Sequence, residues 1–412
     1  MSEPIRSRVS LIRSDLLRRV EKCEGVQYLM KITGIIAECN PFHEGHKYLI
    51  RKSKEITGAD YTVVLLSGDF VQRGAPAAEP KDKRTRDLLE GGADAVLELP
   101  VLYSTAGAEI FAEGAVQILD RLSCITDLCF GSESGDIEYL EKNAEFLLNE
   151  SEEFKAALRK NLKDGDSFPA ARDAAACETA GISLARTPND LLATEYLINL
   201  SRANAERQNR IIPHAILRTA TESASSIRER MLKTDPYAIG TEDFSEMLFY
   251  RLMLIKRLEK TMPGIDRLED YVDVSEDLAQ SMRDKAAGYT GFESFTEALK
   301  SRNLTYTRIA RALIHILLGI RKSELAAFRM PGYVRVLGVR SDSADSLLAE
   351  LSRGRIPVLT ALAKDQEKLT AHYDRMLAMD VFASQLYDGV LAIKKGERNP
   401  DHCEFRKKLI KV

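Results

Sequence analysis

The chain has 412 residues, enough for two or three domains of ordinary size. Its composition, 44% hydrophobic and 29% charged, excludes disordered, collagen-like and small disulfide-rich proteins. The formal net charge of −3 gives no overall attraction for nucleic acid, so we expect no DNA partner, and any RNA surface must be a local patch. No apolar run approaches the roughly 18 residues that span a bilayer, so we expect a soluble protein with no membrane association.

The cysteines and the N-terminal segment indicate where the protein works and where its fold begins. The six cysteines contain no CxxC pair, so we expect reduced, packed thiols and a cytoplasmic location. Residues 1–29 are mildly basic and lack the apolar core of a secretory signal. We interpret them as an N-terminal extension, either disordered or a start-site artefact, and expect the folded chain to begin at Met30.

Strand and helix patterns alternate over the next hundred residues. Apolar runs predict strands at 32–37, 61–66, 93–99 and 125–130, and amphipathic stretches predict helices at 46–57, 81–90 and 106–121. This order predicts an α/β fold with a Rossmann-like, doubly wound parallel sheet. Ligands of such sheets bind outside the carboxyl ends of the strands, so the segments ECNPFHEGH, SGDFVQRG, ELP and FGSE should surround the site.

The remainder of the chain is mostly helical in pattern. Residues 135–206 predict helices, 210–217 a fifth strand, and 222–231 a helix with serine caps at its start. From about 235 onward, Leu, Arg, Lys and Glu recur at helical spacing. Residues 333–339 and 356–361 predict short strands of a mixed second domain. We therefore divide the chain into domains at 30–235 and 236–412, the second largely helical.

The segment NPFHEGHKYL, directly after the first predicted strand, is the strongest chemical signal. Pro41 ends the strand, and His43 and His46 lie three residues apart where a helix begins, so both imidazoles share one face. A helix N-terminus attracts anions, and Gly45 lets an anion approach the backbone. The arrangement suits a leaving pyrophosphate, on which negative charge develops in the transition state.

Two other interpretations of the histidine pair are a zinc site and packed core residues. HExxH is absent, and no third His or Cys stands at ligand spacing. A position after a strand, at its carboxyl end, is unusual for core histidines. The chain also lacks the Walker motif GxxxxGK[ST] and the dinucleotide motif GxGxxG, so the commonest phosphate-binding loops are missing.

The segment Asn40–Leu49 resembles the HxGH motif of the nucleotidylyl-transferase superfamily. Further blocks resemble the bacterial tRNA(Met) cytidine acetate ligase family: GIIAECNPFHEGHKYL, VVLLSGDFVQRGAPA, GADAVLELP, FGSESGDIEYL, PNDLLATEYL, SASSIR and PGYVRVLG. They extend from Lys31 to about Gly338. The resemblance implies that 30–235 is an ATP-binding nucleotidyltransferase-like domain and that 236–412 binds tRNA.

The resemblance implies a ligase that works in two steps. Acetate and ATP, with Mg²⁺ bound to the ATP, would give acetyl-adenylate and pyrophosphate. The acetyl group would then pass to N4 of the wobble cytidine of elongator tRNA(Met), forming N4-acetylcytidine. Two alternatives are a small-molecule adenylyltransferase and a non-catalytic RNA-binding protein. The long helical region weighs against the first, and the intact HEGH and FGSE segments weigh against the second. The oligomeric state stays open.

The resemblance also implies the site residues. His43 and His46 would be catalytic, and ATP would contact the first strand, loop and helix through Ile36, Ala37, Glu38, Cys39, Asn40, Pro41, Phe42, His43, Glu44, Gly45, His46, Lys47, Tyr48 and Leu49. Further ATP contacts would come from Gly131, Asn189 and Arg218. Without the family, simpler interpretations explain these residues equally well: Gly131 as a turn glycine, Asn189 as a helix cap and Arg218 as a solvated strand end.

The segment SASSIR resembles the second phosphate motif of the superfamily. It implies that Ser226 and Arg228, with Ser225, bind the β- and γ-phosphates, although a plain capped helix explains the motif alone equally well. The sequence departs from the family at Ala193, where we expect glycine, and in a short segment between Arg218 and Ser223. Gln72 and Arg73 are expected substrate contacts without an assigned role.

Two basic patches are candidates for RNA binding. The segment 394–412 carries seven basic residues against three acidic ones, including Lys394, Lys407 and Lys408. A second patch consists of Arg308, Arg311, Arg321 and Lys322. Each patch has an equally simple interpretation as a solvated helix face.

The first prediction concerns metal. Because His43 and His46 lack further ligands at zinc spacing, we expect no stoichiometric protein-bound zinc, and Mg²⁺ should enter only with ATP. Elemental analysis of the purified protein tests this expectation. One tightly held zinc per chain would contradict the assignment of the histidine pair to phosphate.

Overall fold

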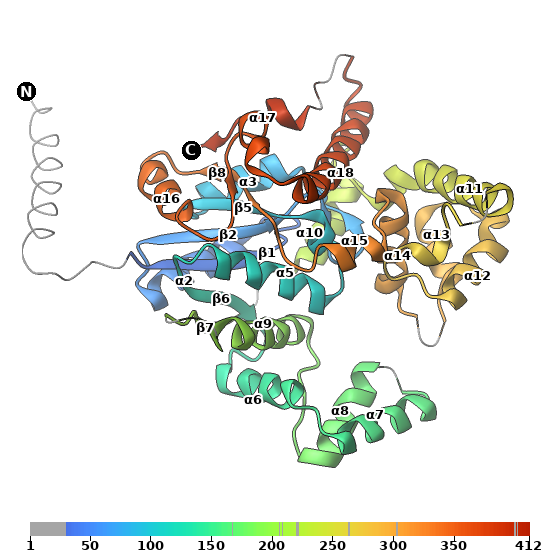
Figure 1. Cartoon of the computed structure of the whole chain (residues 1–412), viewed down its shortest axis with the longest axis horizontal. Coiled ribbons are helices and arrows are strands. Elements are labelled where there is room, and N and C mark those ends of the chain that lie inside the picture. The colour runs from blue at the N-terminus through green and yellow to red at the C-terminus, as the bar shows by residue number, and fades with distance from the viewer. Residues whose placement is uncertain are drawn as a thin grey trace, which may run out of the picture.

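The fold is a central sheet with helices on both faces and two groups of helices that project from it (Figure 1). This computed structural model describes residues 30–412, except 167, 206, 208, 220–221, 263, 302–303, 399–400 and 402. The expectations for residues 1–29 lie outside the described residues.

The main sheet has the strand order β10-β8-β5-β2-β1-β6-β7, and β9 pairs with β8. Its strands are β1 Ile32–Ala37, β2 Tyr61–Ser67, β5 Ala95–Leu99, β6 Ile125–Ser132, β7 Ile212–Leu217, β8 Val334–Val339, β9 Val358–Leu359 and β10 Ile410–Lys411. Strands β5, β2, β1, β6 and β7 are mutually parallel. Helices cover both faces, which explains why β1 and β2 are continuous apolar runs. The five strands predicted for the first domain are confirmed, with small shifts of their ends.

The last strands lie elsewhere than the sequence suggested. The short strands expected at 333–339 and 356–361 exist as β8 and β9, but they extend the main sheet and do not form a second one. Strand β8 runs antiparallel to β5, with Ala95 opposite Val339, and β10 lies beside β8. An apolar pattern identifies a strand without its partner, and the edge of β5 needs one because open edges expose unpaired backbone groups. The sheet is therefore mixed at this edge.

The helices of the first part surround the sheet. They are α2 Glu44–Thr57, α3 Lys81–Glu90, α4 Val101–Ser104, α5 Ala108–Arg121, α6 Ile137–Leu148, α7 Glu152–Asp164, α8 Phe168–Ala180, α9 Pro188–Ala205 and α10 Ala224–Thr234. Helix α2 contacts four parallel strands, and α9 packs on α5, α6 and β6. Helices α7 and α8 have a small core of their own around Phe154 and project from the body (Figure 1).

The second part is largely helical, as expected. Its helices are α11 Ser245–Thr261, α12 Glu276–Lys285, α13 Phe292–Leu299, α14 Tyr306–Leu318, α15 Lys322–Ala327, α16 Ala344–Leu351, α17 Leu362–Asp365 and α18 Ala371–Lys395. Helix α18 has the length and composition of a membrane span, but half of its most apolar 18-residue stretch is buried inside the protein. Its Tyr387 is fully buried, and its buried Asp380 accepts a hydrogen bond from Tyr333. We interpret α18 as a core helix.

A buried cluster of charges joins α3 to the end of the chain. Lys81 Nζ lies 2.7 Å from Glu98 Oε1 and 3.1 Å from Glu404 Oε2, and Arg335 contacts both carboxylates. Lys407 Nζ lies 2.7 Å from the other oxygen of Glu404. Burial alone would raise the pKa of Glu404, but these three cations outweigh it and hold the pKa well below its usual range.

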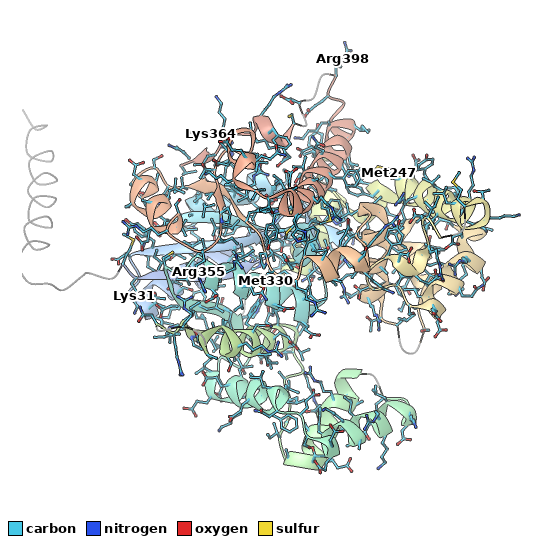
Figure 2. The ribbon with its side chains drawn as sticks, viewed as in Figure 1. Lys31, Met247, Met330, Arg355, Lys364 and Arg398 are labelled. Atoms are coloured by element: carbon cyan, nitrogen blue, oxygen red, sulfur yellow. The ribbon has the colours of Figure 1, made fainter. Side chains whose placement is uncertain are left out.

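Five of the eleven basic residues in the two RNA patches have partners in distant parts of the chain. Lys407 pairs with Asp82 and Asp388 as well as Glu404, and Lys394 pairs with Asp243. In the second patch, three residues also have partners: Arg311 with Asp273, Arg321 with Asp266, and Lys322 with the Val274 carbonyl. Local charge counts missed these pairs because the partners come from distant parts of the chain. The other six are exposed: Arg308, Lys395, Arg398, Arg406, Lys408 and Lys411. Figure 2 shows Arg398 projecting beyond the end of α18.

We predict that Glu404→Gln destabilises the fold. Removing one charge from a buried ion cluster leaves the other charges without compensation, at a cost of about 3–5 kcal/mol in the free energy of unfolding. Denaturant titration at pH 7 measures this loss. Because the folded pKa of Glu404 lies below the unfolded one, its contribution is present above about pH 4.3 and disappears as the pH falls.

The matched control is Glu397→Gln, which removes the same charge from an exposed side chain on the same C-terminal segment. We expect its free energy of unfolding to stay within about 0.5 kcal/mol of the parent. Equal stability of the parent and Glu404→Gln would show that the cluster does not hold the C-terminal segment.

Candidate active site at the carboxyl edge of the sheet

The two histidines of the HEGH segment cap helix α2 reciprocally. His43 is the N-cap residue, and its Nδ1 accepts a hydrogen bond from the Gly45 N–H at 3.0 Å. His46 Nδ1 accepts one from the His43 N–H at 3.3 Å. Because both Nδ1 atoms accept, the ring proton of each neutral imidazole lies on Nε2. The sequence correctly placed both residues at the helix start, although His43 precedes the helix.

The surroundings of the pair keep both rings neutral. Burial, with smaller effects from His43 and Arg218, lowers the pKa of His46 to about 3. Burial and Arg218 also lower the pKa of His43. His43 Nε2 is buried and has no hydrogen-bond partner within the described structure. The pair therefore offers two Nε2–H donors at neutral pH, and that of His43 has no acceptor within the described structure.

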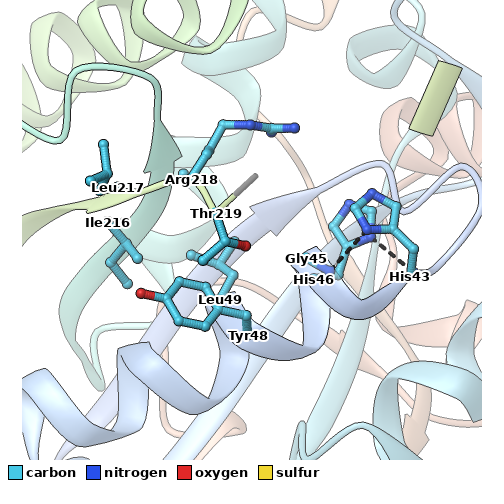
Figure 3. A pocket seen from close by; sticks show the side chains of 10 residues that line it. His43, Gly45, His46, Tyr48, Leu49, Ile216, Leu217, Arg218 and Thr219 are labelled. Carbon is cyan, nitrogen blue, oxygen red and sulfur yellow. Dashed lines mark hydrogen bonds between the residues drawn. The ribbon is translucent and has the colours of Figure 1, made fainter. Parts of the chain in front are cut away.

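These rings open onto a cavity of about 390 Å³ that reaches the solvent. The predicted residues that line it are Ile36, Ala37, Glu38, Cys39, Asn40, His43, His46, Leu49, Gly131, Asn189 and Arg218. A small adjoining recess of about 40 Å³ is lined also by Gly45 and Tyr48. Figure 3 shows both residues with Arg218 and the two histidines. The structure thus brings together residues from β1, β6, β7 and α9 at the carboxyl ends of the strands.

Four residues of the predicted ATP segment contribute in other ways. Phe42 stacks on the His46 ring with the ring centres 5.9 Å apart. Pro41 is buried, whereas Glu44 and Lys47 form an ion pair of 3.7 Å on the surface of α2. None of these four side chains lines the two cavities. Their ATP contacts, implied by the family, stay predictions.

One side of the cavity is built from β6, β7 and α9. Asn189 Nδ2 donates to Glu133 Oε1 at 2.5 Å, and its Oδ1 accepts from Arg218 Nη1 at 3.2 Å. Gly131 lies beside the Arg218 side chain: a Cβ added to this glycine would be 3.5 Å from the arginine, an ordinary contact distance. Asn189 therefore positions Arg218 beside Gly131, and all three lie where the sequence placed a nucleotide site.

The other side contains the SASSIR helix, α10. Ser225 lines the cavity, but the Ser226 hydroxyl donates to Glu222 on the exposed surface, at 3.1 Å. Arg228 Nη1 donates to the carbonyl of Asn40 at 3.0 Å, and Asn40 lines the cavity. Arg228 therefore contacts a lining residue but is not itself part of the lining. Of the three predicted residues of this motif, the structure places Ser225 on the cavity wall, brings Arg228 close to it and leaves Ser226 outside it.

Sequence reasoning missed the apolar lining and several supports. Phe111, Phe130, Leu192 and Tyr196 line the cavity, and their signal in the sequence is that of ordinary core residues. Glu133 stands in FGSE, a block that the motif search had marked, but nothing indicated that its carboxylate would hold Asn189. Cys39 has a φ of 46°, unusual for a residue with a side chain, at the turn that leads into the motif.

Comparison with known proteins places the chain in a family. The model of the HIGH Nucleotidyl Transferase family matches residues 30–401. A tRNA(Met) cytidine acetate ligase of Thermoanaerobacter sp. (strain X514) is 35% identical over 392 residues, which cover 87% of this chain and 95% of that one. The ligase of Caldanaerobacter subterraneus subsp. tengcongensis is 34% identical, with the same shares covered.

A solved structure agrees in fold. The crystal structure of Thermotoga maritima TmcAL bound with alpha-thio ATP superimposes with a TM-score of 0.81 at 25% identity, covering 93% of this chain and all of that one. The match confirms the mixed sheet with its helical second part. With the family model, these relatives and the histidine pair in view, the chain belongs to the HIGH nucleotidyl transferases and, within them, to the tRNA(Met) cytidine acetate ligase family.

Proposed function

We propose that this protein is an ATP-dependent ligase that attaches an acetyl group to N4 of the wobble cytidine of elongator tRNA(Met). The observation that carries the proposal is the pair of neutral Nε2–H donors of His43 and His46 on the wall of the cavity. The relatives are named tRNA(Met) cytidine acetate ligases, which supports an acetylated cytidine of tRNA(Met) as the product. The TmcAL structure with alpha-thio ATP supports ATP as the nucleotide.

In the first step, an acetate oxygen attacks the α-phosphorus of ATP. The new O–P bond forms as the bond from the α-phosphorus to the bridging oxygen breaks, giving acetyl-adenylate and pyrophosphate. Negative charge builds on the departing pyrophosphate, and neutral imidazole donors at a helix N-terminus stabilise such charge. His43 and His46 need no proton transfer for this role, which fits their lowered pKa values.

In the second step, N4 of the cytidine attacks the acetyl carbonyl, the carbonyl C–O bond to the phosphate breaks, AMP departs, and N4 releases one proton to solvent. We expect Gly131, Asn189 and Arg218 to hold the nucleotide through both steps, since they form one side of the cavity. Mg²⁺ is expected to arrive with the phosphates of ATP. A bacterial tRNA-modifying enzyme of this kind would work in the cytoplasm, which agrees with the scattered cysteines.

We predict that His46→Ala lowers acetate-dependent ATP–pyrophosphate exchange by about 10²–10³-fold, the usual cost of losing one well-placed donor. The rate should fall more than the affinity for ATP, because the donor acts mainly on charge that develops in the transition state. Thermal melting and tRNA binding of the same purified variant should stay close to the parent. Exchange within a few-fold of the parent would contradict the role of the pair.

The matched control is Lys52→Ala, a surface substitution on the same helix, which should exchange at the parental rate. The pH dependence adds a second test. Because the pKa of His46 is about 3, the parent should show no ionisation of this residue near pH 6.5 in its exchange rate. A step near pH 6.5 that disappears in His46→Ala would mean that the histidine acts as an acid or a base.

A further inference from the structure

The hairpin after β2 presents Arg73 to the cavity from a fixed backbone. The hairpin strands are β3 Phe70–Val71 and β4 Ala75–Pro76. Gly74 has a φ of 75° and packs closely against α14. A Cβ added to this glycine would lie 2.3 Å from the backbone nitrogen of Arg311. On the other side, the Gln72 N–H donates to Glu38 Oε1 at 3.0 Å. The hairpin is therefore held on both sides, and Arg73 and Gln72 line the cavity.

Two guanidinium groups meet at one hydroxyl on this side of the cavity. Arg73 Nη1 donates to Ser225 Oγ at 3.2 Å, and Arg228 Nη2 donates to the same oxygen at 3.3 Å. Ser225 stands in the first turn of α10, whose N-terminus adds a partial positive charge. The hairpin and α10, which are distant in the sequence, thus bring positive charge to one point.

The negative charge at this point is smaller than the positive charge. Glu38 Oε2 lies 3.4 Å from Arg73 Nε and is the carboxylate that contacts this arginine. Among the described residues, Arg228 forms no ion pair and donates only to the Asn40 carbonyl and Ser225. Burial and the charge of Arg73 lower the pKa of Arg228. Two cations against one carboxylate in a half-buried recess favour the binding of an anion.

The strand order places the hairpin with Arg73 and the nucleotide side of the cavity on opposite flanks of β1. The order β2-β1-β6-β7 places the hairpin after β2 on one flank of β1, whereas Gly131 and Arg218 lie at the ends of β6 and β7 on the other. The two histidines follow β1, between the flanks. In the proposed reaction, a carboxylate must approach an α-phosphate that is itself negative. A cation on the far flank from the nucleoside would offset this repulsion.

We propose that Arg73 binds the carboxylate of acetate and holds it for attack on the α-phosphorus, with the Gln72–Gly74 turn as its rigid support. Arginine suits this role because its planar guanidinium matches the two oxygens of a carboxylate. The side chains of Ile36 and Phe111 line the same cavity and provide apolar surface for a methyl group. This inference rests on the proposed function and adds the residue that selects its smallest substrate.

Initial rates of acetate-dependent ATP–pyrophosphate exchange test the assignment when acetate and ATP are varied separately. For Arg73→Ala we expect the KM for acetate to rise about 10- to 100-fold, the effect of losing a hydrogen bond to a charged group. The KM for ATP should change less than about threefold. Arg73→Lys keeps the positive charge but loses the planar guanidinium that can bind both carboxylate oxygens. It should therefore recover part of the acetate affinity.

Arg86→Ala is the matched control, because this exposed arginine on α3 makes no ion pair with any described residue and lies outside both cavities. Both of its KM values should equal those of the parent. If Arg73→Ala raises the KM for ATP as much as that for acetate, the arginine binds phosphate and the proposal is wrong. Unchanged KM values for both would also overturn it. A parent that shows no acetate-dependent exchange would refute the proposed function instead, so the two failures can be told apart.

Discussion

A single buried arginine holds the two central strands at the edge where the cavity lies. Arg84, on α3, is fully buried, and its guanidinium donates to the carbonyls of Glu38 at 2.8 Å and Ser67 at 3.0 Å, and to that of Gly68. Its Nε donates to the Glu79 carbonyl. Parallel strands leave their last carbonyls without ladder partners, and a cation with five donors satisfies several at once. The positions of the histidine motif and of the hairpin after β2 both depend on this contact.

Helix α3 also carries the second buried cation of this region. Lys81 lies one turn before Arg84 and reaches Glu98 and Glu404, so one face of a short helix touches both the cavity edge and the end of the chain. Two buried cations are costly unless every donor finds an acceptor. Here main-chain carbonyls satisfy the arginine, and carboxylates with the Ser384 hydroxyl satisfy the lysine. The sheet, the C-terminal segment and the hairpin are thereby fixed relative to one another.

The local parts of this architecture could be predicted from the sequence, and the distant pairings could not. Five strands, their intervening helices and the position of His43 and His46 at a helix start follow from short patterns, because apolar runs and helix starts are local properties. The antiparallel placement of β8 depends on which sheet edge is free, and nothing within residues 333–339 encodes it. The ion pairs of Lys407 likewise involve Asp82, far away in the chain. The resemblance assigned Asn189 and Arg218 to one site, but their hydrogen bond to each other was not predicted.

The position of β8 and β10 has a consequence for how the protein is made. While the ribosome is still producing the helical region, the edge of β5 that β8 later covers has no neighbour, because β8 follows α15 in the chain. The nascent protein therefore exposes an apolar strand edge, which favours wrong association. This edge is covered only once β8 has been made and has paired with β5. Deleting residues 410–412 would leave every motif residue in place, yet the sheet would lose β10, the strand beside β8.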